Sequence, residues 1–131
     1  MAEFYFEYDA ADKVFAVRMA GVVTDDVFKA CYAETLRRAA GREIRAALID
    51  LSAVDRYDVS AAAMRDAGKL QPLFPDPTPR YLIATSDDMF GMARMLQLVS
   101  DPGREGMRVV RSVQEAYDAI GLNTARFERL P

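Results

Sequence analysis

Two short runs of almost uninterrupted apolar residues constrain the fold of this chain more than any other feature. Residues 46–51 read Ala-Ala-Leu-Ile-Asp-Leu, and residues 81–85 read Tyr-Leu-Ile-Ala-Thr. Runs of this length and composition are typical of strands that are buried on both faces, as in a parallel sheet covered by helices. The sequence therefore predicts a sheet with these two runs as central strands.

Alternating residues predict further strands. Phe4, Phe6 and Tyr8 stand at every second position of residues 3–8, and the alternation resumes at Val14 after a short polar turn, so we expect an antiparallel hairpin. Gly21 marks a β-bulge towards the end of the second strand. Residues 107–111 also alternate and are placed nearer the edge of the sheet.

Start and stop signals predict four helices. Gly41 and Gly121 stand where the first and last helices end, and the two middle helices are expected at residues 61–70 and 89–99. Four of the six prolines fall within residues 71–79, which we interpret as an extended connection, and residues 101–103 end the third helix. The expected caps at the helix starts are Thr24, then Asp58 or Ser60, then Ser86, and finally Ser112, which forms a capping box with Glu115.

The element order is β-β-α-β-α-β-α-β-α, which predicts a single α/β domain with parallel crossovers and helices packed on a mixed sheet. We assign residues 1–121 to this domain, with a loop at residues 52–57 and a frayed tail at residues 122–131. Apolar residues make up 51% of the 131-residue chain, enough for a core without disulfides.

Composition excludes several classes of function. The chain has no histidine and one cysteine, which excludes an intrachain disulfide, a Cys/His zinc site and a nucleophile activated by histidine. A net charge of -3 argues against nucleic-acid binding. Without a signal peptide or a long apolar span, a cytoplasmic location is expected. Cys31 lies on the apolar stripe of the first helix and is expected to be a buried, inert thiol.

One motif carries a family resemblance. The strand end Leu48-Ile49-Asp50-Leu51-Ser52-Ala53-Val54 is followed by Asp58-Val59-Ser60-Ala61. With the element order, this resembles the STAS domain of SpoIIAA-like anti-sigma-factor antagonists over residues 3–121. The aromatic hairpin and the methionine-rich third helix are more similar to a divergent STAS-like branch that also resembles CRAL-TRIO lobes.

The resemblance implies a regulatory role for Ser60. In regulatory members, a partner kinase that also sequesters a sigma factor phosphorylates the second serine of the loop, and Ser60 holds that place. Val59 stands here for the first serine of the family motif, and Ala61 for its glycine. A phosphate is favourable at a helix N-terminus, whereas Asp58 would oppose it. The alternative is that Ser60 only caps the helix.

Polar residues follow the two central strands, where ligands bind in open α/β sheets. We expect them to cluster as a switch loop. Carboxylates in such a cluster could also do acid–base work or hold Mg²⁺, so a hydrolase using Asp50, Asp58 and Asp87 is a third reading. No glycine-rich phosphate loop accompanies them, and we expect no metal and no cofactor. The residues are Asp50, Ser52, Asp58, Thr85, Ser86 and Asp87.

The third predicted helix is apolar on more than one face. Flexible methionines suit a surface that repacks around a partner or an acyl chain, and the alternative is a helix covered by residues 71–79. The interface or ligand candidates are Phe74, Met89, Phe90, Met92 and Met95.

The sequence therefore favours a non-enzymatic STAS-like binding module whose partner is another protein or a second copy in a homodimer. The alternative function is a carrier of a small apolar ligand such as a lipid, held in a pocket between the third helix and residues 71–79.

Overall fold

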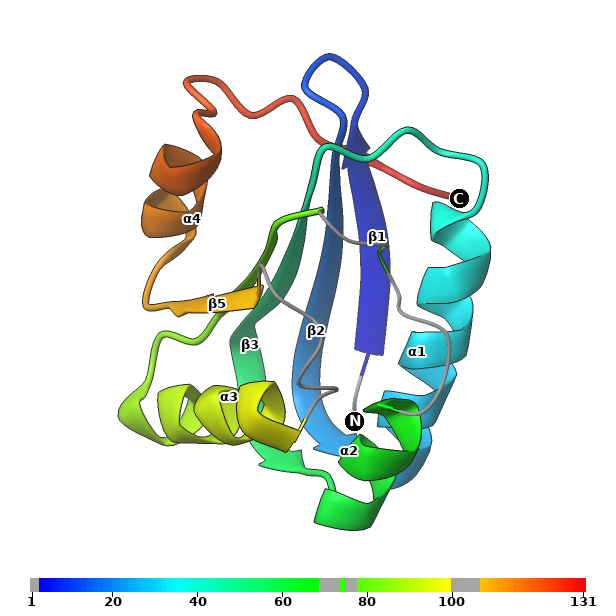
Figure 1. The fold of residues 1–131 in the computed structure, drawn as a ribbon, viewed down its shortest axis with the longest axis vertical. Coiled ribbons are helices and arrows are strands. Elements are labelled where there is room, and N and C mark those ends of the chain that lie inside the picture. Colours follow the sequence, from blue (N-terminus) through cyan, green and yellow to red (C-terminus); the bar gives the residue numbers. More distant parts are fainter. Residues whose placement is uncertain (1–2, 69–73, 75–77, 100–106) are drawn as a thin grey trace.

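The computed structural model describes residues 3–68, 74, 78–99 and 107–131 of the chain (Figure 1). Strands and helices alternate along these residues after an initial hairpin. Their bounds are β1 Glu3–Asp9, β2 Val14–Thr24, α1 Asp25–Ala39, β3 Ala46–Asp58, α2 Ala61–Gly68, β4 Arg80–Ile83, α3 Asp87–Val99, β5 Met107–Val110, α4 Val113–Ile120 and β6 Glu128–Arg129.

One sheet in the order β5-β4-β3-β2-β1-β6 organises these elements. β2, β3, β4 and β5 are parallel to one another, and β1 is antiparallel to both β2 and β6. The predicted hairpin and the two central parallel strands are confirmed, and the chain is an α/β domain with a mixed sheet.

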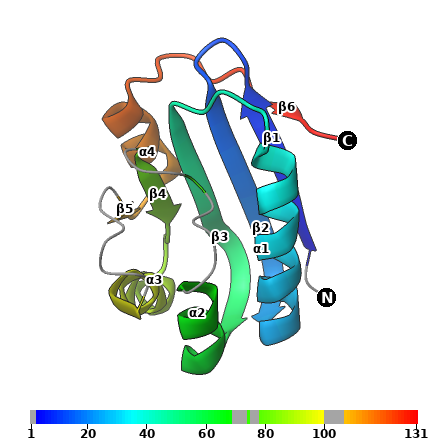
Figure 2. The ribbon, with the colours of Figure 1, turned by 45° about the vertical axis from the view of Figure 1, so that its right-hand side comes forward.

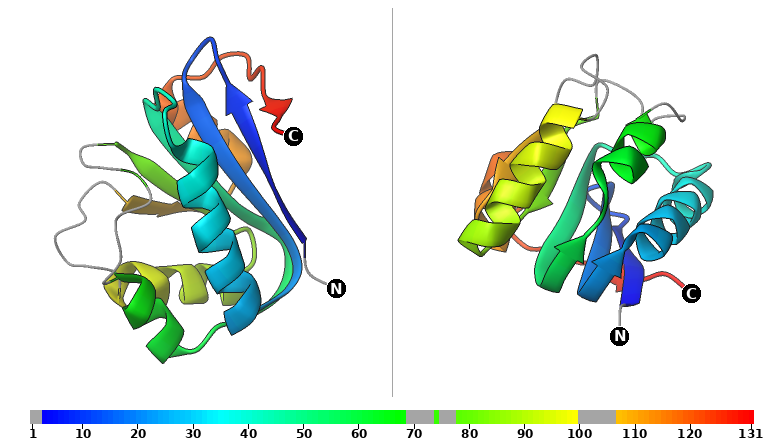
Figure 3. Two further views of the ribbon diagram at one scale, coloured as in Figure 1. Left: turned by 90° about the vertical axis from the view of Figure 1, so that its right-hand side faces the viewer. Right: turned by 90° about the horizontal axis from the view of Figure 1, so that it is seen from below.

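The two faces of the sheet are covered differently. α1, α2 and α3 lie in a row on one side of the strands, which Figure 3 shows in its right-hand view. Phe15, Phe74 and Leu82 are among the buried residues of this face. On the opposite face, α4 covers a smaller core that includes Leu48 and Ile83. α4 therefore packs apart from the other three helices.

The third strand is longer than predicted, and the expected loop at residues 52–57 belongs to it. Two register shifts against β2 explain the error. Arg18 and Ala20 are two positions apart, but their partners Asp50 and Ala53 are three apart, so β3 has one extra residue there. A second shift follows Gly21. The extra residues of β3 change its twist, so that Leu51, Val54 and Tyr57 are buried at every third position. Such spacing does not match the two-residue period expected of a strand.

The predicted bulge at Gly21 is confirmed, because a register shift lies there and the residue has φ +80°. That conformation is one that glycine adopts without steric cost.

The C-terminal tail was wrongly expected to fray. Leu122 is buried, and β6 extends the sheet beside β1 (Figure 2). The Leu130 N–H donates to the Phe6 carbonyl at 2.8 Å, and the Arg126 N–H donates to the buried carboxylate of Asp9 at 2.9 Å. These contacts join the tail to the first strand of the domain.

Most helix boundaries follow their predicted caps. Thr24, Ser60 and Ser112 each accept a first-turn N–H, and Gly121 ends α4 in the left-handed conformation. Ser60, rather than Asp58, caps α2. Ser86 caps α3, which begins at Asp87, two residues before the prediction. The predicted connections at residues 71–73, 75–77 and 101–103 lie outside the described residues.

Candidate functional site

Ser60 is hydrogen-bonded to a carboxylate on another helix. Its backbone N–H donates to Asp25 Oδ1 at 2.7 Å, and its hydroxyl donates to Asp25 Oδ2 at 2.8 Å. The same Oγ accepts the Ala63 N–H at 3.1 Å, which caps α2. Asp25 is the first residue of α1, so this paired contact, which we call the latch, joins the starts of two helices. Figures 1 and 2 show α2 beside the first turns of α1.

The latch is exposed to solvent and favours a charged Asp25. The hydrogen bonds from the Ser60 backbone and hydroxyl lower the pKa of the Asp25 carboxyl below its ordinary value. Ser60 is exposed. The exposed carboxylate of Asp58 lies 4.0 Å from Arg56.

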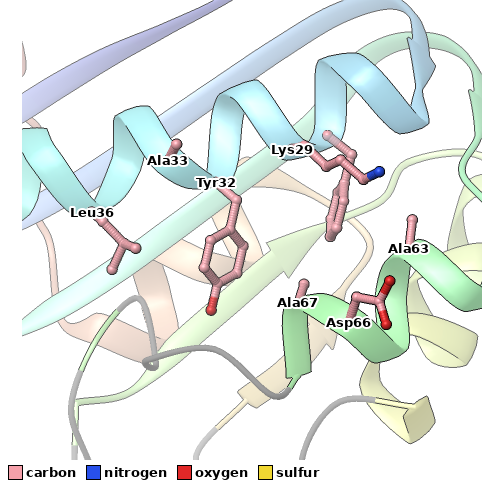
Figure 4. Close-up of a pocket in the computed structure, with 8 residues that line it drawn as sticks. Lys29, Tyr32, Ala33, Leu36, Ala63, Asp66 and Ala67 are labelled. Atoms are coloured by element: carbon pink, nitrogen blue, oxygen red, sulfur yellow. The ribbon is translucent and has the colours of Figure 1, made fainter.

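An apolar groove lies between α1 and α2 (Figure 4). Its volume is about 250 Å³. In Figure 4 the ring of Tyr32 points from α1 towards Ala67 on α2, and Lys29 and Asp66 lie on opposite sides of the groove. The lining residues are Phe28, Lys29, Tyr32, Ala33, Leu36, Ala63, Asp66 and Ala67.

Asp50 and Ser52 lie together on β3, beside Arg18 rather than at the latch. The Ser52 hydroxyl donates to Asp50 Oδ1 at 2.6 Å. Asp50 Oδ2 accepts from Arg18 at 2.7 Å, and Glu7 accepts from the same guanidinium at 2.7 Å. Burial opposes the charge of Arg18, but the hydrogen bonds that its guanidinium donates to Glu7, Tyr117 and Asp50 outweigh this effect and raise its pKa. This ion network stabilises the face of the sheet on which α4 lies.

The predicted cluster of polar residues is therefore only partly formed. Asp58 is eight residues beyond Asp50 on the same strand, about 26 Å away at the usual rise per residue. Asp87 pairs with Arg111 at 2.6 Å. Thr85 and Ser86 are exposed, and Ser86 caps α3 through the Met89 N–H. The three carboxylates proposed for hydrolysis are thus not gathered at one point, because β3 continues well past β4.

Within the described residues, no group of three or more acidic, cysteine or histidine side chains could hold a metal ion.

The interface or ligand candidates divide between core and surface. Phe74 and Met89 are buried, and the Phe74 ring centroid lies 5.7 Å from that of Phe15. Phe90 and Met92 are half-buried, with the Arg111 guanidinium 4.8 Å above the Phe90 ring. Met95 is 49% exposed. Phe74 and Met89 thus belong to the core, and Met95 is the most exposed of the five candidates.

The buried thiol is as predicted. Cys31 is buried, and that burial raises the pKa of its thiol to about 11. A thiol with this pKa is almost wholly protonated near neutral pH, which makes it a poor nucleophile.

Sequence reasoning missed the partner of Ser60. From the sequence alone, Asp25 is an ordinary acid in the positive first turn of a helix. It lies 35 residues before Ser60, and neither propensity nor periodicity reports such a pairing. The groove was missed for the same reason, because its walls come from two helices.

Solved structures have the same arrangement of sheet and helices. One is an uncharacterized protein of the DUF3478 family with a SpoIIAA-like fold from Shewanella loihica PV-4. It matches with a TM-score of 0.57 and 20% identity over 91% of this chain and 93% of that chain. Another is the anti-sigma factor antagonist SpoIIAA in its unphosphorylated form, with a TM-score of 0.56 and 14% identity over 91% of this chain and 98% of that chain.

The fold is SpoIIAA-like. The STAS resemblance predicted this fold, and the structural matches confirm it. No protein-family model matches the chain, and no curated protein does. None of the helices within the described residues is long and apolar enough to cross a membrane.

Proposed function

We propose that this chain is a non-enzymatic regulatory module that binds another protein, and that phosphorylation of Ser60 switches the binding. The observation that carries the proposal is the latch, in which an exposed serine hydroxyl donates to the carboxylate of a neighbouring helix. A structural counterpart with this fold is an anti-sigma factor antagonist described in its unphosphorylated form. The agreement of position and fold supports the proposal.

The chemistry of the switch follows from the latch. A partner kinase transfers the terminal phosphoryl group of a nucleoside triphosphate to Ser60 Oγ, which loses its proton, and nucleoside diphosphate leaves. The product has no hydroxyl proton to donate to Asp25 Oδ2. It also adds a charge of about -1.5 to -2 beside that carboxylate.

The phosphate acts on α1 and α2 in opposite ways. The N-terminus of α2 favours the new negative charge, because its first-turn N–H groups face Ser60. The Asp25 carboxylate repels the same charge at hydrogen-bond distance. Phosphorylation therefore exchanges an attractive contact between the helices for a repulsive one, which changes the surface that a partner meets.

The test compares Ser60 with a second helix-capping serine. Intact mass and peptide mapping of the protein from its own cells show whether Ser60 carries phosphate. Wild type, Ser60→Ala and Ser60→Asp are then immobilised and the recovered proteins quantified, with Ser86→Asp as the matched control. We expect phosphate on Ser60 and a partner whose recovery differs among the Ser60 forms but not for Ser86→Asp. An unmodified Ser60, with equal recovery of every partner, would refute the proposal.

We propose self-association as a second form of binding. Met95 on α3 favours it, because this apolar side chain is 49% exposed. Native mass spectrometry of the purified protein gives the oligomeric state. A dimer that Met95→Lys dissociates supports a homodimer through α3, and a monomer at all concentrations contradicts it.

A further inference from the structure

We propose that the groove between α1 and α2 binds a small, uncharged apolar molecule and that the latch controls access to it. Groove binding is independent of the proposed function. Only the opening of the latch by phosphorylation of Ser60 rests on the proposed function.

The volume and the walls of the groove define the size and the apolar character of the ligand. A volume of about 250 Å³ is slightly below the roughly 300–1,000 Å³ of sites for drug-sized ligands. An apolar cavity of about 150 Å³ is known to take up benzene. Phe28, Tyr32 and Leu36 supply one wall, and Ala63 and Ala67 keep the other wall open by their small side chains. The groove therefore fits a compact apolar molecule with one or two rings or a short aliphatic chain.

The charged residues at the rim of the groove define the charge of the ligand. Lys29 on α1 and Asp66 on α2 are both exposed and lie on opposite sides of the groove (Figure 4). Their opposite charges balance, so the rim attracts neither an anion nor a cation strongly. An uncharged molecule complements this rim, whereas a charged one meets a like charge on one side.

The latch is placed to control the groove. Asp25 and Ser60 each stand three residues before a lining residue, Phe28 on α1 and Ala63 on α2. The latch therefore lies about one turn before the first lining residue of each helix, at one end of the groove. Breaking it frees the start of α2, a helix of only eight residues, to move away from α1.

The first test uses N-phenyl-1-naphthylamine, an uncharged two-ring probe that fluoresces in apolar surroundings, with its sulfonated analogue ANS as the charged comparison. Ala33 is an exposed lining residue, and Ala33→Met places a longer side chain at the groove. Ala30 is exposed on the same helix but does not line the groove, so Ala30→Met is the matched control. We expect saturable binding of the neutral probe, weakened about tenfold by Ala33→Met alone.

The outcomes that overturn groove binding are equally specific. The proposal of groove binding is wrong if the neutral probe shows no saturable binding, if ANS binds more tightly than the neutral probe, or if the two methionine variants have equal effects. Circular dichroism of each variant establishes that the fold is retained.

The second test separates the latch from the phosphoswitch. Asp25→Asn weakens the latch without any modification of Ser60, and Asp26→Asn removes a neighbouring charge that does not contact Ser60. We expect Asp25→Asn to bind the neutral probe several-fold more tightly than wild type and Asp26→Asn to leave the affinity unchanged. Equal affinities in the three proteins would refute control by the latch. A response to Asp25→Asn in a protein that is never phosphorylated would leave this inference standing and remove the proposed function.

Discussion

Asp25 is the residue on which the contact between α1 and α2 depends, and its charge makes that contact sensitive to pH. The hydrogen bonds from Ser60 hold the pKa of Asp25 below the value of about 3.9 that an aspartate has in an unfolded chain. A depressed pKa in the folded state gives stability that is present above the unfolded value and lost as pH falls through the folded value.

We therefore predict that Asp25→Asn lowers the free energy of unfolding at pH 7 and that its difference from wild type shrinks below about pH 4. Urea denaturation of both proteins at a series of pH values measures this difference. Asp26→Asn, in the same first turn of α1, controls for the loss of a helix-dipole interaction. A difference that stays constant down to pH 2 would show that the contact does not depend on the charge of Asp25.

Arg18 is the central residue of the ion network on the opposite face of the sheet. Its side chain is 14% exposed, and it pairs with both Glu7 and Asp50 at 2.7 Å. Replacing it with methionine leaves the buried carboxylate of Asp50 and the half-buried carboxylate of Glu7 without this cation. We predict that Arg18→Met costs roughly 3 kcal/mol of stability, as for the loss of one partner from a buried pair.

Thermal and urea denaturation measure that loss, with Arg108→Met on the exposed surface of β5 as the control, for which we expect a change below about 0.5 kcal/mol. Adding Glu7→Gln and Asp50→Asn to Arg18→Met removes the unpaired charges and should restore part of the stability. No recovery in the triple variant would contradict an electrostatic origin of the loss.

At the level of helices and strands, the sequence predicted those elements whose signals are local. Ser112 caps α4 as expected, since its hydroxyl accepts the Glu115 N–H. The Glu115 carboxylate accepts the Arg111 N–H, one residue before the donor expected for a capping box. Both contacts lie within four residues, where cap chemistry can be read directly.

The errors occurred where an element depends on a distant neighbour. The second half of β3 is a strand because it pairs with β2 through two register shifts, and its own residues have no alternation of period two. β6 has two residues, too few for a pattern, and exists because β1 offers it an open edge. Non-local pairing of this kind cannot be inferred from one segment of sequence.

β6 and the residues before it stabilise the domain. Deleting residues 126–131 removes the Leu130 hydrogen bond to Phe6, the Arg126 N–H donated to buried Asp9, and the pairing of β6 with β1. At about 1 kcal/mol for each hydrogen bond, we predict a loss of roughly 3 kcal/mol. Urea denaturation measures it. Arg126→Ala keeps the backbone donor and loses only the charge interaction of the Arg126 side chain with Asp9, so it should lose much less stability than the deletion. A deletion variant as stable as wild type would show that the tail contributes nothing.

Across the whole molecule, the sheet separates the candidate site from the second core. The latch and the groove belong to α1 and α2, whereas α4 packs on the other face with Leu48, Ile83 and Val110. The sheet predicted from the sequence is confirmed, and Ser60, which lies on its α1–α3 side, remains a candidate site. The sequence could not predict Asp25 or the groove, because those depend on how two helices separated by β3 come to lie side by side.

This separation predicts a local response to modification of Ser60. Ser60→Asp keeps an acceptor for the first-turn N–H of α2 but places a carboxylate beside Asp25. We expect hydrogen exchange in α2 and in the first turn of α1 to become about tenfold faster, equivalent to about 1.4 kcal/mol of local stability. Exchange in α4 should stay at the wild-type rate, because α4 packs on the far face of the sheet. Hydrogen-exchange mass spectrometry measures both regions in one experiment, with Ser86→Asp at the start of α3 as the control. If α4 also exchanged faster in Ser60→Asp, the sheet would be transmitting the change, and a partner bound on either face could sense the state of Ser60.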